Sequence, residues 1–355
     1  MRLIHHRKKQ TAFRRDPSLG RKHLRKKNQW KNPYQWGCSL FLLIIILLLA
    51  LGIHSCAKYR QEKAAEEKES SSALEKQEKE PLYQPQVTAQ TEQIGQEIES
   101  AYGVLLNLES GKIIAERSSD ARINPASMTK VLTLLVAAEQ IKDKSGYFTI
   151  TEEITDYCYF NDCSVVGYEK GEQVPISELF YGCILCSGAD ASLALAELAS
   201  GSHEAFVAQL NAKIRELGRA NTAHFTNSVG LYDEDHYCTV QDMAVFLKAA
   251  LENEFCRKVL STRTYDSLPT SAHPEGQVLS NWFIRRIEDR DTGDVAVLGG
   301  KTGYVVESKN CAASFAKNSK GEEFICVTGM GSGAWQVIDD HAALYKTHCV
   351  SEEEA

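Results

Sequence analysis

Residues 124–135 read NPASMTKVLTLL, and they form the stretch around which the rest of the chain is organised. Pro125 suits the start of a helix, and the apolar residues after Lys130 predict a central core helix. Residues three apart share a helical face, so the Lys130 amine can reach the Ser127 hydroxyl. Burial lowers the pKa of a lysine, and a neutral Lys130 can then take the proton of Ser127. A capping serine and a surface lysine would show the same spacing, so the motif needs support from elsewhere in the chain.

Two later motifs supply that support. A serine turn contains Ser187 within YGCILCSGADA (181–191), and GGKTGY occupies 299–304. Ser-x-x-Lys, a serine turn and Lys-Thr-Gly follow in the order found in penicillin-recognising serine enzymes. With these motifs the chain resembles the D-alanyl-D-alanine carboxypeptidases, serine peptidases that are low-molecular-weight penicillin-binding proteins, from about Ile98 to Tyr345. The resemblance also extends to sequence segments between the motifs, at 167–172, 179–182, 211–218 and 225–231.

The resemblance implies a role for each motif residue. Ser127 attacks the carbonyl of the penultimate D-Ala of a peptidoglycan stem peptide and forms an acyl-enzyme, which β-lactams would also form. Lys130 takes the Ser127 proton, and Ser187 passes a proton to the leaving amine. Four residues of the third motif would bind the substrate. Lys301 and Thr302 would hold the carboxylate of the substrate, and Gly303 would leave room for the substrate backbone beside the strand. The backbone amide of Tyr304 would form the oxyanion hole together with the backbone amide of Ser127. No cofactor or metal is needed for this chemistry.

One residue departs from the family pattern. The second motif is usually Ser-x-Asn, but position 189 is alanine. An asparagine there would bond the substrate amide and steady the lysine, and a contact of this kind is worth about 1.5–3 kcal/mol. Asp190 is adjacent but should point elsewhere. An alternative is therefore a catalytically weak protein that binds the cell wall or senses β-lactams. A β-lactamase is a less favoured alternative, because no Glu-x-x-x-Asn loop is evident in the sequence.

The same resemblance implies an α/β (α+β) architecture, with an antiparallel sheet flanked by helices and a helical subdomain. The pattern predicts a hairpin over 103–117. Strands at both ends of the domain with helices between them predict a sheet whose first and last strands are neighbours, and a cleft between sheet and helices. Further helices are predicted at 177–199, 203–217, 239–252 and 335–347, and further strands at 295–298, 311–315 and 324–329.

The amino-terminal part differs in charge from the remainder. Residues 1–31 hold twelve Lys or Arg against Asp16, a net charge of about +11, and the other residues sum to −18. An uncharged run at 37–57 can cross a bilayer as a helix, so the basic segment is a topology signal and not a nucleic-acid site. A retained single-pass anchor in the cell membrane is favoured over a cleaved signal peptide or a lipidated Cys56. The predicted organisation is a basic cytoplasmic tail (1–36), an anchor (37–57), a charged disordered stalk (58–97), an extracellular catalytic domain (98–349) and an acidic tail (350–355).

Cysteines and histidines allow other interpretations. Cys158 and Cys163 could ligate zinc together with Cys183 and Cys186, or could form a disulfide, but small apolar thiols are favoured. A Ser-His-Asp triad is also conceivable from His224, His236 and Asp242. A lysine base makes a histidine base unnecessary, so these three residues are expected to be surface or structural residues.

Overall fold

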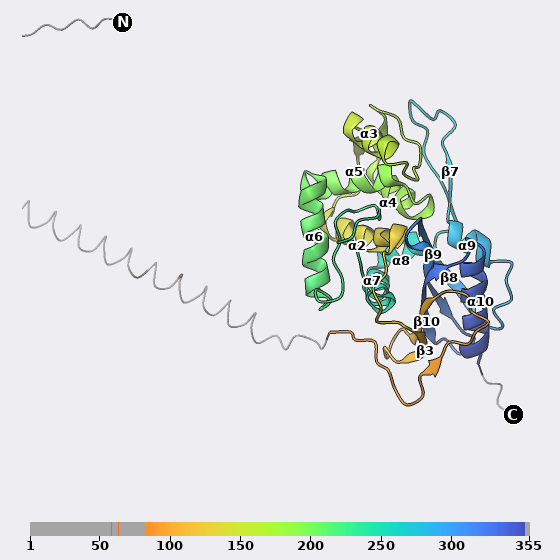
Figure 1. The fold of residues 1–355 in the computed structure, drawn as a ribbon. Helices are drawn as coiled ribbons and strands as arrows, with labels where there is room; N and C mark the ends of the chain where they lie inside the picture. Colours follow the sequence, from red (N-terminus) through yellow and green to blue (C-terminus); the bar gives the residue numbers. More distant parts are fainter. Residues whose placement is uncertain (1–57, 59–62, 64–81, 352–355) are drawn as a thin grey trace, which may run out of the picture. The chain divides into compact units, whose positions relative to one another are not determined.

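The computed structural model describes residues 58, 63 and 82–351. The chain divides into two units, 1–79 and 80–355, and every element described below belongs to the second unit (Figure 1). The predicted tail and anchor, residues 1–57, lie outside the described residues. Within the described part of the chain no helix has the length and apolar character needed to cross a membrane.

A six-stranded sheet with the order β1-β3-β2-β10-β9-β8 forms the centre of the unit (Figure 1). All neighbouring strands are antiparallel except β1 and β3, and Val104 on β2 pairs with Val327 on β10. The first long strand therefore lies beside the last, as predicted. The strands are β1 (Glu92–Gln93), β2 (Tyr102–Asn107), β3 (Ile113–Arg117), β8 (Ala296–Val305), β9 (Lys309–Lys317) and β10 (Glu323–Gly331).

The two faces of the sheet are covered by different helices, so the central strands are buried on both sides. Successive side chains of a strand point to opposite faces. Leu105 accordingly packs with Tyr345 of α10 (Gln336–His348), while Val104 and Leu106 join the larger core around α2 (Lys130–Gln140). Figure 1 shows α10 against the sheet on the side opposite the helical part. The buried sheet thus fixes where α2, with the Ser-x-x-Lys motif, meets the strands.

The helical part lies between β3 and β8 in the sequence. It contains α2, α3 (Glu152–Phe160), α4 (Ile176–Leu185), α5 (Ala189–Ser200), α6 (His203–Glu216), α7 (Val240–Glu252) and α8 (Glu254–Ser261), and α9 (Trp282–Ile287) follows just before β8. Two short hairpins accompany these helices, β4 (Tyr147–Thr149) with β5 (Gln173–Pro175) and β6 (Thr264–Asp266) with β7 (Val278–Ser280). The predicted helices at 203–217, 239–252 and 335–347 are confirmed within one or two residues.

The single helix predicted over 177–199 is wrong. The segment is two helices, α4 and α5, separated by a turn at 186–188. Ser187 has a φ of 58°, in the left-handed region, and a helix cannot continue through such a residue. The apolar pattern runs on through the turn because both helices are buried, so periodicity alone did not reveal the break.

The predicted limit between stalk and catalytic domain at residue 98 is too late in the chain. Residues 92–93 form β1 beside β3, Ile94 is buried, and Gln86 N–H donates to Gly111 O at 2.8 Å. The described residues from 82 onward therefore pack on the folded unit. At the other end, Ser351 N–H donates to Asp294, and residues 352–355 lie outside the described part.

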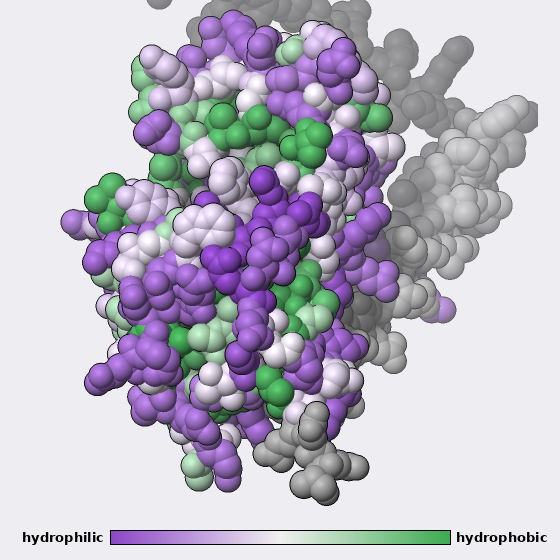
Figure 2. Space-filling view, turned by 90° about the vertical axis from the view of Figure 1, so that its right-hand side faces the viewer, coloured by the Kyte–Doolittle hydropathy of each residue, from purple (hydrophilic) through white to green (hydrophobic). Residues whose placement is uncertain are grey.

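The face on the side of α9 and α10 is mostly hydrophilic. Figure 2 shows hydrophobic residues there as small patches separated by hydrophilic ones. Among the exposed aromatic side chains of this unit are Trp282 and Trp335, and the Arg286 guanidinium lies over both rings. This stacking covers part of the apolar surface.

Candidate active site

Ser127 lies in a tight turn that precedes α2. Ala126–Thr129 form one turn of 3-10 helix, and Ala126 takes a left-handed φ of 46°. The Asn124 side chain holds this turn, because its Oδ1 accepts the Ala126 N–H at 2.9 Å while its Nδ2 donates to His236 O at 2.9 Å. The turn leaves Ser127 partly exposed although its neighbours in α2 are buried.

The Lys130 amine reaches Ser127, as the helical spacing predicts. Its Nζ lies 3.1 Å from Ser127 Oγ and donates to Val229 O at 2.6 Å. Only 2% of Lys130 is exposed, and burial lowers the pKa of this amine below its usual value. A lower pKa means that the amine is uncharged at a lower pH. Only the uncharged amine can accept the hydroxyl proton of Ser127.

The loop at 227–231 positions Lys130, and sequence reasoning did not assign it this role. Asn227 Oδ1 accepts the backbone N–H groups of residues 229–231 at 2.6–3.2 Å, and Thr133 Oγ1 donates to Ser228 O at 2.7 Å. These bonds hold the Val229 carbonyl at the amine. The stretch 225–231 did appear among the segments that carry the family resemblance, and that was the available signal.

Gly230 explains why this loop can lie so close to the nucleophile turn. Its φ is 84°, and a Cβ atom at this position would lie 1.9 Å from Ala126 O. Only glycine combines that backbone conformation with so close an approach.

The second and third motifs meet through a direct hydrogen bond. Lys301 Nζ donates to Ser187 Oγ at 2.9 Å and to Thr302 O at 2.6 Å. Ser187 comes from the turn between α4 and α5, whereas Lys301 lies on the edge strand β8. Burial, reinforced by the nearby Lys130 charge, lowers the pKa of Lys301 to about 7.

Strand β8 runs directly beside the nucleophile turn at Gly303. A Cβ atom on Gly303 would lie 3.0 Å from Ser127 N and 2.8 Å from Cys311 Sγ. Thr302 is partly buried and Tyr304 is 61% exposed. The contacts of Lys301 and Gly303 bring the sheet edge together with Ser187 and with Ser127, so the three predicted motifs form one site.

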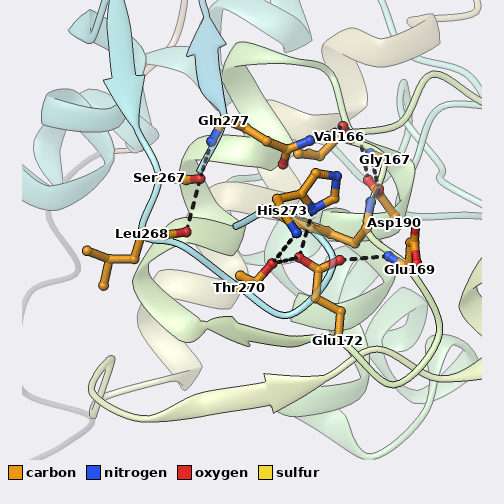
Figure 3. Close-up of polar contacts among 11 residues, drawn as sticks. Val166, Gly167, Glu169, Glu172, Asp190, Ser267, Leu268, Thr270, His273 and Gln277 are labelled. Atoms are coloured by element: carbon orange, nitrogen blue, oxygen red, sulfur yellow. Dashed lines mark hydrogen bonds and ion pairs between the residues drawn. The ribbon is translucent and has the colours of Figure 1, made fainter. Parts of the chain in front are cut away.

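Ala189 and Asp190 hold the serine turn against a neighbouring loop. Asp190 is buried, and its carboxylate accepts the backbone N–H groups of residues 166–168 at 2.9–3.2 Å. Figure 3 shows Asp190 directed at this loop. The Ala189 N–H donates to Ser164 O at 2.8 Å. Asp190 is therefore committed to the loop and does not replace the missing asparagine, as expected.

The same loop is fastened to the hairpin β6–β7 by a buried carboxylate. Glu172 accepts from Thr270 Oγ1 at 2.5 Å and lies 3.0 Å from His273 Nδ1, while Glu169 N–H donates to it at 2.8 Å (Figure 3). Gln277 Nε2 adds a bond to Val166 O at 3.4 Å. The hairpin, which the sequence did not predict, thus supports the wall that contains Ser187.

No Ser-His-Asp triad forms among His224, His236 and Asp242. The His236 ring lies 2.8 Å from Thr129 Oγ1 and accepts Thr226 N–H at 3.0 Å, and burial lowers its pKa to about 3. Asp242 caps α7, and the His224 ring lies 2.7 Å from Asp235 O. All three have structural contacts, in agreement with the prediction.

The described cysteines are all free thiols, at positions 158, 163, 183, 186, 238, 256, 311, 326 and 349. Within the described part of the chain no group of three or more metal-ligating side chains is present. The zinc interpretation of Cys158, Cys163, Cys183 and Cys186 thus gains no support.

A cleft of about 600 Å³ continues from the end of β8. One side is formed by Tyr304 and residues 305–307, and the other by the end of α3 and the loop after Asn227. Its lining includes the side chains of Asp162, Asp233 and Glu307. Tyr304 belongs to this lining, whereas Ser127, Lys130, Ser187 and Lys301 do not.

Solved structures with a similar fold identify the class. The crystal structure of the Streptomyces K15 DD-transpeptidase superposes with a TM-score of 0.61 over 70% of this chain and 95% of that one, at 24% identity. The D-alanyl-D-alanine carboxypeptidase of Mycobacterium tuberculosis H37Rv gives a TM-score of 0.61 over 70% and 89%, at 25% identity. The fold is that of the penicillin-binding DD-peptidases.

Sequence comparison narrows this class to a family. The family model for D-alanyl-D-alanine carboxypeptidases (peptidase family S11) matches residues 86–332, and the chain belongs to this family. It is 32% identical over 266 residues to D-alanyl-D-alanine carboxypeptidase DacF of Bacillus subtilis, covering 73% of this chain and 65% of that protein. With DacA of Escherichia coli K12 it shares 34% over 165 residues, 44% of this chain and 40% of that one. The chain thus spans less than two thirds of these relatives.

Proposed function

We propose that this protein is a serine-type D-Ala-D-Ala carboxypeptidase that removes the terminal D-Ala from peptidoglycan stem pentapeptides. The observation that carries the proposal is the Lys130–Ser127 contact beside a strand whose Lys301 reaches Ser187. An exopeptidase needs a nucleophile with its base, and also a separate cation that binds the terminal carboxylate of the substrate. Family membership and the printed names of the relatives support the same activity.

In the proposed reaction, Ser127 Oγ attacks the carbonyl of the penultimate D-Ala while its proton passes to the Lys130 amine. The backbone amides of Ser127 and Tyr304 stabilise the oxyanion, and Ser187 transmits a proton to the leaving D-Ala amine. Lys301 and Thr302 hold the terminal carboxylate of the substrate. Water then hydrolyses the ester on Ser127 and regenerates the free serine.

Labelling with a fluorescent penicillin tests the nucleophile, and release of free D-Ala from a stem pentapeptide mimic tests the reaction. The native chain should give both signals, and Ser127→Ala should give neither. Ser110→Ala, in the exposed turn between β2 and β3, is the matched control and should retain both. Label that persists in Ser127→Ala would refute the assigned nucleophile.

A second candidate function rests on Ala189. Without the usual asparagine the site could bind β-lactams or wall peptides and turn them over very slowly, as a sensor or binding protein. Penicillin labelling without detectable release of D-Ala would favour this candidate. Rapid hydrolysis of the label itself would instead favour a β-lactamase.

We also propose that residues 37–57 anchor the protein in the cell membrane, with the tail cytoplasmic and the catalytic domain extracellular. The support is the uncharged run, its basic flank and the aromatic residues beside it. Fractionation of cells should recover the full chain with membranes, and the same chain lacking residues 37–57 should not be recovered there. Equal recovery of both in the membrane fraction would contradict the anchor.

A further inference from the structure

Helix α3 ends in a motif that brings two cysteines together. Cys163 N–H donates to Cys158 O at 3.0 Å, Asp162 N–H donates to Tyr159 O at 3.3 Å, and Asp162 has a left-handed φ of 48°. These are the two hydrogen bonds and the backbone conformation of a Schellman motif, in which the third residue from the helix end faces the second residue beyond it. In most helices that pair makes a hydrophobic contact, but here it is Cys158 and Cys163.

The pair combines a protected thiol with an accessible one. Cys158 is buried, and Cys163 is partly exposed. Both line a pocket of about 350 Å³ together with Asp190. The backbone hydrogen bond between the two residues holds them beside each other at the end of α3.

We propose that Cys158 and Cys163 form a redox modification site, which reacts with low-molecular-weight disulfides to close an intramolecular disulfide and thereby slows acylation of Ser127. The modification itself is independent of the proposed function, whereas its effect on acylation rests on that function.

The reaction is a thiol–disulfide exchange in two steps. The Cys163 thiolate attacks one sulfur of RS–SR, forming a Cys163–S–S–R bond and releasing RS⁻. Cys158 Sγ then attacks Cys163 Sγ, the second RS⁻ leaves, and the Cys158 proton passes to a released thiolate. Two protein thiols are oxidised and one external disulfide is reduced to two thiols. The neighbouring Cys158 thiol lowers the pKa of Cys163, while the Cys163 thiol and burial raise the pKa of Cys158, which suits attacking and resolving roles.

Two connections link the pair to the site. Ser164, next to Cys163, accepts the Ala189 N–H at 2.8 Å, so movement of Cys163 is transmitted to the turn that contains Ser187. Asp162, between the two cysteines, lines the cleft beyond Tyr304. Closing a disulfide fixes the two sulfur atoms at about 2 Å from each other, and the backbone adjustment this needs displaces both connections.

Treatment of the folded full chain with glutathione disulfide, followed by peptide mapping, tests the modification. We expect the native chain to lose two hydrogens and to yield a peptide pair linked through Cys158 and Cys163. Cys158→Ser should instead accumulate the mixed disulfide on Cys163. Cys349→Ser, on the far side of the sheet, is the control and should still form the bond. Absence of the linked peptide, with the fold shown intact by thermal unfolding, would overturn the proposal whatever the protein's activity.

The rate of acylation by fluorescent penicillin tests the coupling. We expect a several-fold decrease after oxidation, full recovery after reduction, and no response in the Cys158→Ser/Cys163→Ser double variant. If the double variant unfolds, Cys163→Ala, which lacks the attacking thiol, serves in its place. A disulfide that forms without changing the rate, or a rate change that persists in the double variant, would contradict the coupling. Loss of labelling in the reduced native chain would contradict the proposed function and leave the mapping result valid.

Discussion

The two walls of the site are held in different ways. On the nucleophile wall, Ser127 and Lys130 belong to one helical turn, and their contact follows from local spacing. On the opposite wall, Ser187 occupies a strained turn whose position depends on Asp190, the loop at 164–168 and the hairpin β6–β7. The reacting pair of the first wall lies within four consecutive residues, although the Val229 carbonyl adds a distant contact to Lys130. The reacting groups of the second wall, Ser187 and Lys301, are 114 residues apart and meet only through the fold. Substitutions should accordingly have larger effects on the first wall.

Lys130→Met should have the largest effect, because it removes the base and keeps an unbranched apolar chain. We expect the acylation rate to fall by about 10²–10⁴-fold. The midpoint temperature of thermal unfolding should be unchanged or raised, since burying the amine costs free energy in the folded state. Lys248→Met, at a surface pair with Glu252, is the control. A loss of less than tenfold would show that another group takes the Ser127 proton.

Gly303→Ala tests the meeting of sheet and nucleophile turn. The new methyl group would lie 3.0 Å from both Ser127 N and Pro125 O, so β8 or the turn must move by a few tenths of an ångström. A small misplacement of reacting groups can cost about 100-fold in rate, and we expect acylation to slow by up to that factor. Gly329→Ala on β10, where the nearest atom is 3.5 Å away, should leave the rate nearly unchanged. Equal rates for the two variants would disprove the close approach.

The pH dependence of kcat/KM tests the cation of the opposite wall. Since burial lowers the pKa of Lys301 to about 7, its amine loses its charge as pH rises above that value. Binding of a carboxylate should weaken, and kcat/KM for D-Ala release should fall by about tenfold for each pH unit above about 8. Lys301→Gln should lose this alkaline decrease along with most of its activity. A native profile that stays flat to about pH 9 would rule out the assignment.

Ala189→Asn should have the smallest effect, and an opposite sign. A side-chain amide at this position would restore a hydrogen bond worth at least about 1.5 kcal/mol, which corresponds to roughly a tenfold faster acylation by penicillin. Ala191→Asn, one helical position from Asp190 and fully buried, is not expected to raise the rate. An unchanged rate in Ala189→Asn would indicate that another group already fills the role.

Much of this arrangement could be predicted from the sequence because it depends on local pattern. The spacing of Ser127 and Lys130 placed both groups on one turn, and the alternation and turn residues gave the hairpin β2–β3. The three ordered motifs implied a cleft between sheet and helices, and β8, which contains the third motif, lies at the edge of the sheet beside the Ser127 turn.

The remaining features depend on contacts between distant residues, which periodicity does not report. The break at Ser187 lies between two buried helices, so apolar residues continue on both sides of it. The Val229 carbonyl binds Lys130 across 99 residues of chain, and no property of valine indicates this. The packing of residues 82–97 was missed because that segment is polar and makes its bonds mainly through its backbone.

The pairing of β2 with β10 has a consequence for biosynthesis. More than two hundred residues separate the paired positions Leu105 and Cys326, and bringing such remote segments together carries a large loop-closure entropy. Contacts of this range slow folding. The central sheet cannot be completed until nearly the whole chain has emerged, so a nascent polypeptide that already contains Ser127 and Lys130 still lacks the edge strand that would present a substrate to them.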